Sequence, residues 1–130
     1  MKTAAGRLDP GEAAFQSSVI ELAQRLGWKV AHFRRALTVD RRGRQRWQTP
    51  VTADGAGFPD LVLVRRGVLI FAELKTDTGT RPPAQRAWLR DLEDVPRSMR
   101  SPDADRVLVR VWRPRDWLEL ELELRGARRG

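Results

Sequence analysis

The chain has 130 residues, enough for one hydrophobic core, and this length predicts a single domain over residues 1–130. Lys and Arg number 25 against 17 Asp and Glu, and the resulting net charge of +8 favours a polyanionic partner. The lack of cysteine excludes a disulfide framework and a thiolate metal site. With no export signal and no run of about 18 apolar residues, we expect a soluble cytoplasmic protein.

An apolar stripe at helical spacing predicts a first helix near the start of the chain. The stripe comprises Phe15, Val19, Leu22 and Leu26. Asp9 and Pro10 suit the N-cap and the first helical position, and Gly27 ends the helix. The next segment, "WKVAHF" at residues 28–33, predicts a short strand and opens the sheet of a core expected over about residues 10–118.

Residues 34–57 show almost no apolar periodicity, and a loop of about 24 residues is far longer than the median connection of about 4–6. Loops of this length are usually functional or disordered. This one is rich in arginine and carries a tryptophan, a combination that suits phosphate contacts and stacking on an unpaired base. The candidate DNA-binding residues are Arg34, Arg35, Arg41, Arg42, Arg44, Arg46 and Trp47. The alternative is a solvated basic loop that anchors nothing.

Two apolar runs separated by Arg-Arg-Gly follow, in "GFPDLVLVRRGVLIFAELK", and predict an antiparallel pair of strands. If the Arg-Gly pair forms a two-residue turn, Asp60 faces Glu73. Lys75 then projects on the same side as Glu73, because side chains alternate along a strand. Three ionisable groups therefore meet at one end of one face. A three-residue turn would shift the register by one and separate them.

The remaining elements complete an α/β pattern. "PPAQRAWLRDLE", residues 82–93, predicts a second helix with prolines at its start, and "RVLVRVW", residues 106–112, predicts a fourth strand. "LELELEL" has the period of a strand, but Glu and Leu favour a helix, and we expect a short helix. The predicted fold is a mixed sheet of about four strands flanked by helices.

Facing carboxylates at Asp60 and Glu73 repel each other unless a proton or a cation lies between them. Mg²⁺ suits such a pair, because it takes oxygen ligands and can activate water for attack on a phosphodiester. Lys75 could stabilise charge on the phosphate or help to deprotonate the water. The alternative is that Asp60 merely ends the preceding turn while Glu73 and Lys75 form an ion pair. His32 is the only histidine, which excludes a His-based metal cluster or triad.

The motifs "GFPDLVLV", "IFAELKTDTG" and the glutamine of "PPAQRAWL" resemble the PD-(D/E)xK nuclease signature, and in particular its VRR-NUC branch. The resemblance covers roughly residues 12–117. It implies a restriction-endonuclease-like core with the order αβββαβ. It also implies a Mg²⁺-dependent endo- or structure-selective DNA nuclease acting on branched DNA, of phage or bacterial type, for which Mn²⁺ can substitute.

The resemblance also implies a role for each matching residue. The implied metal ligands are the side chains of Asp60 and Glu73 and the backbone carbonyl of Leu74, and the implied catalytic residues are Lys75, Glu12 and Gln85. Glu12 could instead belong to a capping box with Asp9, and Gln85 could cap the second helix if Pro82 is its N-cap. The family usually has Ser or Thr where Pro82 stands. A homodimer is possible, and the alternative functions are a non-catalytic basic DNA-binding module or a nuclease subunit that needs a partner.

Overall fold

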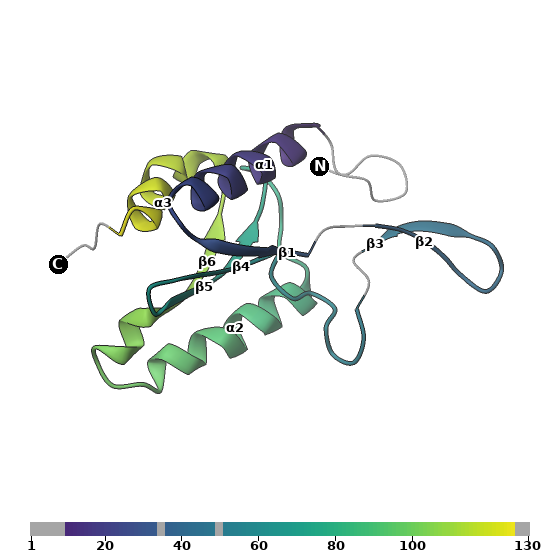
Figure 1. Cartoon of the computed structure of the whole chain (residues 1–130). Coiled ribbons are helices and arrows are strands. Elements are labelled where there is room, and N and C mark those ends of the chain that lie inside the picture. The colour runs from purple at the N-terminus through teal and green to yellow at the C-terminus, as the bar shows by residue number, and fades with distance from the viewer. Residues whose placement is uncertain (1–9, 34–35, 49–50, 127–130) are drawn as a thin grey trace.

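The computed structural model describes residues 10–33, 36–48 and 51–126 and has an α/β architecture (Figure 1). The helices are α1 (Pro10–Arg25), α2 (Pro83–Arg97) and α3 (Trp117–Leu124), with short 3-10 turns at Asp103–Arg106 and Pro114–Asp116. The strands are β1 (Lys29–His32), β2 (Ala36–Val39), β3 (Gln45–Gln48), β4 (Leu61–Arg65), β5 (Val68–Leu74) and β6 (Val107–Trp112). Each helix in the described part of the chain is too short or too polar to cross a membrane.

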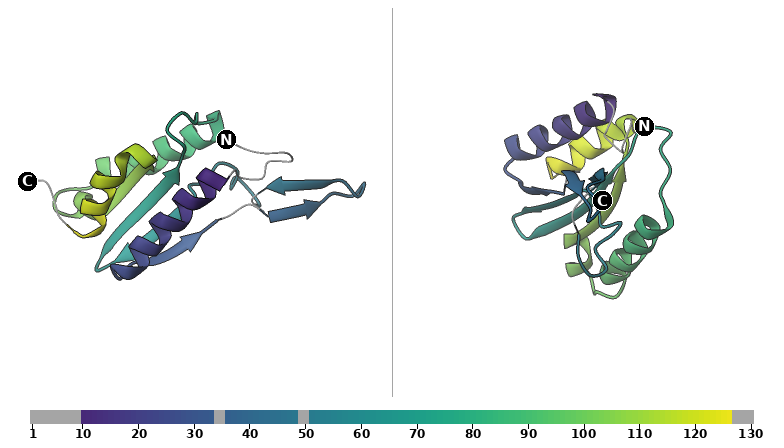
Figure 2. Two further views of the ribbon diagram at one scale, coloured as in Figure 1. Left: turned by 90° about the horizontal axis from the view of Figure 1, so that it is seen from above. Right: turned by 90° about the vertical axis from the view of Figure 1, so that its right-hand side faces the viewer.

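Four strands form a mixed sheet in the order β1-β4-β5-β6. β1, β4 and β5 are antiparallel neighbours, whereas β6 runs parallel to β5, because the chain crosses over through α2 before it returns. α1 and α3 cover one face of the sheet and α2 covers the other (Figures 1 and 2). The predicted mixed four-stranded sheet flanked by helices is confirmed, as is the short helix predicted for "LELELEL".

The turn between β4 and β5 consists of Arg66 and Gly67, whose φ angles of 47° and 78° are both positive. A two-residue hairpin turn of type I′ requires this backbone, which matches the twist of the flanking strands. The turn sets the register, in which Leu61 pairs with Ala72. The register predicted from the sequence is therefore confirmed, and it brings the two carboxylates that flank this pair to the same end of the hairpin.

The main core lies between the sheet and the helices α1 and α3. Its fully buried apolar side chains include Val19, Ala23, Leu61, Leu63, Ile70, Ala72, Leu120 and Leu124. On the face toward α2, Phe58 makes edge-to-face contacts with Phe33, Phe71 and Trp88, at ring-centroid distances of 5.4, 6.1 and 5.1 Å. The loop before β4 is thereby packed against both the sheet and α2.

The prediction of an unstructured loop over residues 34–57 is wrong in its first half. β2 and β3 pair antiparallel, with Val39 opposite Gln45, and form a two-stranded sheet of their own. This hairpin projects from the body of the protein as an arm (Figure 2). Each of its strands has only four residues, so little hydrophobic periodicity marks them in the sequence.

Candidate active site

Asp60 is held between two strands at the edge of the sheet. Its backbone carbonyl accepts a hydrogen bond from the N–H of Phe33, just beyond β1, at 2.9 Å. Its side-chain Oδ2 accepts a hydrogen bond from the N–H of Leu74, the last residue of β5, at 2.8 Å. The carboxylate therefore has a fixed orientation toward the end of β5, and its second oxygen is available for another contact.

Glu73 is the only polar or charged residue that is buried in the described part of the chain, with 1% of its surface exposed. Neither of its carboxylate oxygens has a hydrogen-bond partner among the described residues. Burial raises the pKa of Glu73 to about 9, with a further upward contribution from Asp60 and a partial offset from Lys75. An unpartnered buried carboxylate costs several kcal/mol, so this position requires either a proton or a cation.

Lys75 directly follows β5 and is positioned by the β6–α3 connection. Its backbone N–H donates to the carbonyl of Trp112 at 3.0 Å. The Nη1 atom of Arg113 donates to the carbonyls of Thr76 and Gly79, at 2.6 and 2.8 Å, and so closes the turn after Lys75. The sequence analysis did not single out Arg113, because nothing in its local sequence distinguishes it from the other arginines.

Gln85 occupies the N3 position of α2, and its Oε1 atom is buried without a hydrogen-bond partner. The N-cap residue is Pro82, which has no backbone N–H for a glutamine side chain to accept. The capping role considered for Gln85 is therefore excluded. Gln85 and Glu73 together account for every buried side-chain oxygen or nitrogen in the described residues that lacks a partner.

Gly57 brings the first turn of α2 against the segment that leads to Asp60. A Cβ atom at this position would lie 2.7 Å from the carbonyl carbon of Ala84 and 2.8 Å from the backbone nitrogen of Gln85. Gly57 also has a φ of 86°, which side chains rarely adopt. The sequence analysis quoted this glycine in a motif without a role, and the structure shows that only glycine permits this close approach.

Replacing Gly57 with alanine is expected to lower the free energy of unfolding by about 2 kcal/mol or more, because backbone strain adds to the clash with α2. Gly67→Ala is the matched control. Its φ is also positive, but its nearest neighbour is the tip of Arg106 at 3.8 Å, so only the strain of about 1 kcal/mol applies. Urea unfolding measures both. Equal losses in the two variants would show that the contact with α2 contributes nothing.

Glu12 and His32 lie on neighbouring elements. Glu12 is half-buried in the first turn of α1, and His32 ends β1, where it pairs with Leu61. Within the described ranges no three or more His, Asp or Glu side chains form a group that could hold a metal, so Glu12 does not complete such a cluster with the two carboxylates. Asp9, its suggested capping partner, lies outside the described residues.

The candidate DNA-binding residues belong to the arm, away from the two carboxylates. Arg41, Arg42, Arg44 and Arg46 are exposed at its tip and on β3. Trp47 belongs to β3, and its side chain lies outside the described part of the structure. Arg34 and Arg35 also lie outside the described residues. The structure thus places four of these arginines on one exposed arm, and their contact with DNA stays a prediction.

The donor set at the edge of the sheet fits Mg²⁺. Asp60 and Glu73 supply two carboxylates, and the backbone carbonyl of Leu74, the residue after Glu73 on β5, supplies a neutral oxygen. Mg²⁺ is usually bound by one or two carboxylates and keeps several waters, so it does not need a third acidic ligand. The orphaned Glu73 oxygens are the observation on which this fit depends.

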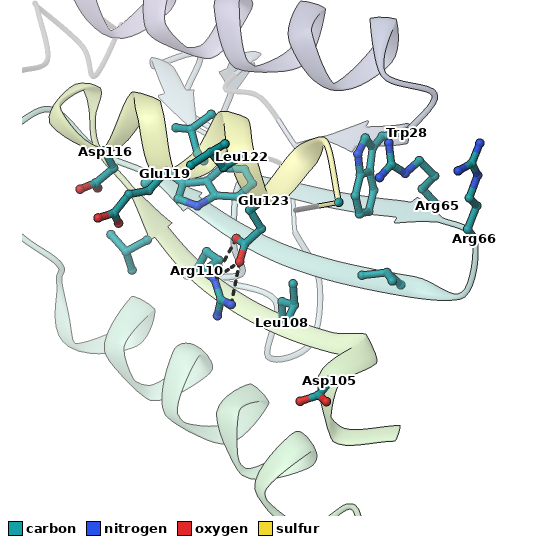
Figure 3. A pocket seen from close by; sticks show the side chains of 15 residues that line it. Trp28, Arg65, Arg66, Asp105, Leu108, Arg110, Asp116, Glu119, Leu122 and Glu123 are labelled. Carbon is teal, nitrogen blue, oxygen red and sulfur yellow. Dashed lines mark hydrogen bonds and ion pairs between the residues drawn. The ribbon is translucent and has the colours of Figure 1, made fainter. Parts of the chain in front are cut away.

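A separate cavity of about 800 Å³ lies on the face of the sheet that carries α3 (Figure 3). It is lined by residues of β6 and α3, together with Trp28, Arg65 and Arg66. Arg110 and Glu123 form an ion pair within it, with 2.9 Å between Nη2 and Oε2 (Figure 3). None of the predicted site residues lines this cavity, so it is distinct from the candidate active site.

Comparisons of the chain with protein-family models, with curated proteins and with solved structures find no match. The features that bear on function therefore lie at the end of the β4–β5 hairpin. They are a buried carboxylate without partners, a second carboxylate oriented toward it, and a lysine held in the next turn.

Proposed function

We propose that this protein is a Mg²⁺-dependent DNA nuclease with a restriction-endonuclease-like core, selective for branched DNA. The observation that carries the proposal is Glu73, a buried carboxylate whose two oxygens lack partners beside a second carboxylate. A purely structural position would not retain such a group, because an apolar residue of the same size would be more stable there. The likeness of the surrounding motifs to PD-(D/E)xK nucleases supports the same reading.

In this proposal Asp60 and Glu73 hold the metal ion, together with the Leu74 carbonyl. When bound, Mg²⁺ supplies the positive charge that activates water and stabilises the phosphate in hydrolysis. The Leu74 N–H keeps the Asp60 carboxylate in its orientation, so binding requires little rearrangement. Lys75 stabilises negative charge that develops on the phosphate, and Arg113 holds the turn that presents it. Gln85 and Glu12 support the site from the two helices.

The charge of the chain favours a nucleic-acid substrate. The net charge of +8 attracts a polyanion, and four arginines gather on the projecting arm. The arm begins just beyond β1, whose last residue pairs with the first residue of β4, next to Asp60. A nucleic acid bound to the arm would therefore pass close to the two carboxylates.

The test is a cleavage panel of labelled single-stranded, linear duplex, forked, flapped and four-way-junction DNA, with Mg²⁺, with Mn²⁺ and with EDTA. We expect divalent-dependent cleavage, faster on the branched substrates, and none by the Glu73→Gln variant. Cleavage in EDTA or by Glu73→Gln would refute the metal site. If the wild-type protein cleaves no substrate, the better assignment is a non-catalytic DNA-binding module or a nuclease subunit that needs a partner. Cleavage on addition of a candidate partner would distinguish the subunit from the module.

A further inference from the structure

In the arm, residues 36–48, the side chains that the structure describes lie outside the hydrophobic core. Val39 is 64% exposed, and none of the others belongs to the core cluster. An isolated two-stranded hairpin is marginally stable in water, so packing within the body does not explain why the chain forms one here. The arm projects away from the four-stranded sheet (Figure 2). Its role is therefore to be sought in what it contacts outside the protein.

Asp40 organises the tip of the arm. Its Oδ1 accepts hydrogen bonds from the backbone N–H groups of Arg42 and Arg44, both at 2.9 Å, and its Oδ2 accepts one from Nε of Arg44 at 2.7 Å. These bonds, led by the Arg44 amide, hold the pKa of Asp40 below its usual value. Gly43 closes the turn with a φ of 78°. The tip thus has a defined shape although it is fully exposed.

The tip concentrates positive charge. Residues 40–46 contain four arginines and one aspartate, and that aspartate is engaged by Arg44. Arg41 and Arg42 lie in the turn itself, at the outermost point of the arm. An ordered turn that presents adjacent guanidinium groups at the end of a narrow ribbon is suited to contacting phosphates on both sides of a groove.

The width of the arm selects the kind of groove. Two paired strands are about 4.8 Å apart and about 10 Å wide with their side chains, which fits the B-DNA major groove of about 12 Å and not the minor groove of about 6 Å. The major groove of A-form RNA is too narrow for such a ribbon. A single strand offers no groove at all.

We propose that the arm enters the major groove of a DNA duplex next to the cleavage site, with Arg41 and Arg42 contacting the backbone. The proposal deepens the proposed function and depends on it for the identity of the substrate at Asp60. Each strand of the arm has four residues and extends about 13 Å from its base, at about 3.3 Å per residue. The substrate would therefore carry intact duplex within roughly four base pairs of the scissile bond.

The first test measures binding by fluorescence anisotropy in EDTA, so that cleavage plays no part. The probes are a DNA duplex, a single-stranded DNA and an RNA duplex of the same length. We expect the DNA duplex to bind most tightly. The double variant Arg41→Gln/Arg42→Gln should bind it at least tenfold more weakly, and the slope of log affinity against log salt should fall by about two. The other two probes should lose much less.

The matched control is Arg97→Gln/Arg125→Gln, which removes the same charge from two helix C-terminal ends. These arginines pair with Glu93 and Glu121, at 3.4 and 2.9 Å, and lie away from the arm. If the control loses as much duplex affinity as the arm variant, general electrostatic attraction explains the binding and the proposal fails. An equal loss on single-stranded DNA or on duplex RNA would also overturn it.

The second test separates the shape of the tip from its charge. Asp40→Asn and Asp40→Ala carry the same net charge, but only asparagine retains an oxygen to accept from the amides of Arg42 and Arg44. We expect Asp40→Asn to bind the DNA duplex at least as tightly as the wild type and Asp40→Ala to bind it several-fold more weakly. Equal duplex affinities of the two variants would overturn a role for the ordered tip.

These results are separable from those on cleavage. Arm-dependent duplex binding without any cleavage would count against a nuclease that acts alone and would leave the arm as a DNA-binding element. Suppose instead that Arg41→Gln/Arg42→Gln and Asp40→Ala bind and cleave DNA as the wild type does, in a metal-dependent reaction. That result would refute the role of the arm in DNA binding and leave the nuclease proposal standing.

Discussion

The Lys75→Ala variant is expected to cleave DNA on the order of a hundredfold more slowly than the wild type, or slower still, with unchanged DNA affinity. The reason is that Lys75 directly follows β5, two residues after Glu73, where in the proposed site its charge would act on the reacting phosphate. The arginines proposed to contact the DNA backbone belong to a separate element. Single-turnover cleavage of a branched and a linear DNA measures the rate, with enzyme above the dissociation constant so that weak binding does not resemble slow chemistry.

Lys29→Ala is the matched control for this variant. Lys29 is exposed at the start of β1 and pairs with Val64, at the opposite end of the sheet from the two carboxylates. Its removal also lowers the net charge by one, and we expect a near wild-type rate. Lys75→Arg should rescue activity poorly, because a planar guanidinium does not take the place of a compact ammonium. Wild-type cleavage by Lys75→Ala would exclude the catalytic role.

Glu73→Gln is expected to change how stability depends on pH in the metal-free protein. The folded-state pKa of Glu73 is raised to about 9 by burial and by Asp60, against an ordinary value of 4.5. Between pH 4.5 and about 9, the Glu73 carboxyl therefore keeps its proton in the folded protein and loses it in the unfolded chain. The wild-type free energy of unfolding should therefore fall as pH rises through this window, at a slope approaching about 1.4 kcal/mol per pH unit.

The stability that this proton contributes is fully present below about pH 4.5 and is lost as pH rises through about 9. Glutamine has the same shape and does not ionise, so the variant should become the more stable protein as pH rises. Denaturant unfolding in EDTA from pH 5 to pH 9 measures the difference. Glu93→Gln, which removes an exposed carboxylate paired with Arg97, should leave the slope unchanged. A constant difference between wild type and Glu73→Gln would contradict the raised pKa.

Adding Mg²⁺ should restore part of the stability that the wild-type protein loses as pH rises. A bound cation favours the ionised form of Glu73, so millimolar Mg²⁺ or Mn²⁺ should raise the melting temperature at neutral pH and above. Glu73→Gln should show little increase. Equal melting of the wild type in EDTA and in Mg²⁺ would count against the metal site, and it would leave the proton on Glu73 as the feature that neutralises the buried carboxylate.

Local sequence signals were sufficient for the elements that carry the two carboxylates. The Arg66-Gly67 pair indicated a two-residue turn, and the positive φ of both residues confirms it over the three-residue alternative. Because side chains in a strand alternate strictly, that single turn determined which residues face Glu73 and which enter the core. The first helix followed equally from its apolar spacing, since one face of α1 packs on the sheet.

The tertiary structure alone decided how far Glu73 is buried and which groups surround it. The parallel pairing of β5 with β6 covers the far side of β5 after a crossover through α2, and no local pattern encodes that contact. The close approach of Gly57 to α2 and the hydrogen bonds from Arg113 likewise join segments distant in the chain. The sequence did not predict the arm, because its strands have four residues each and pair only with each other in a two-stranded sheet.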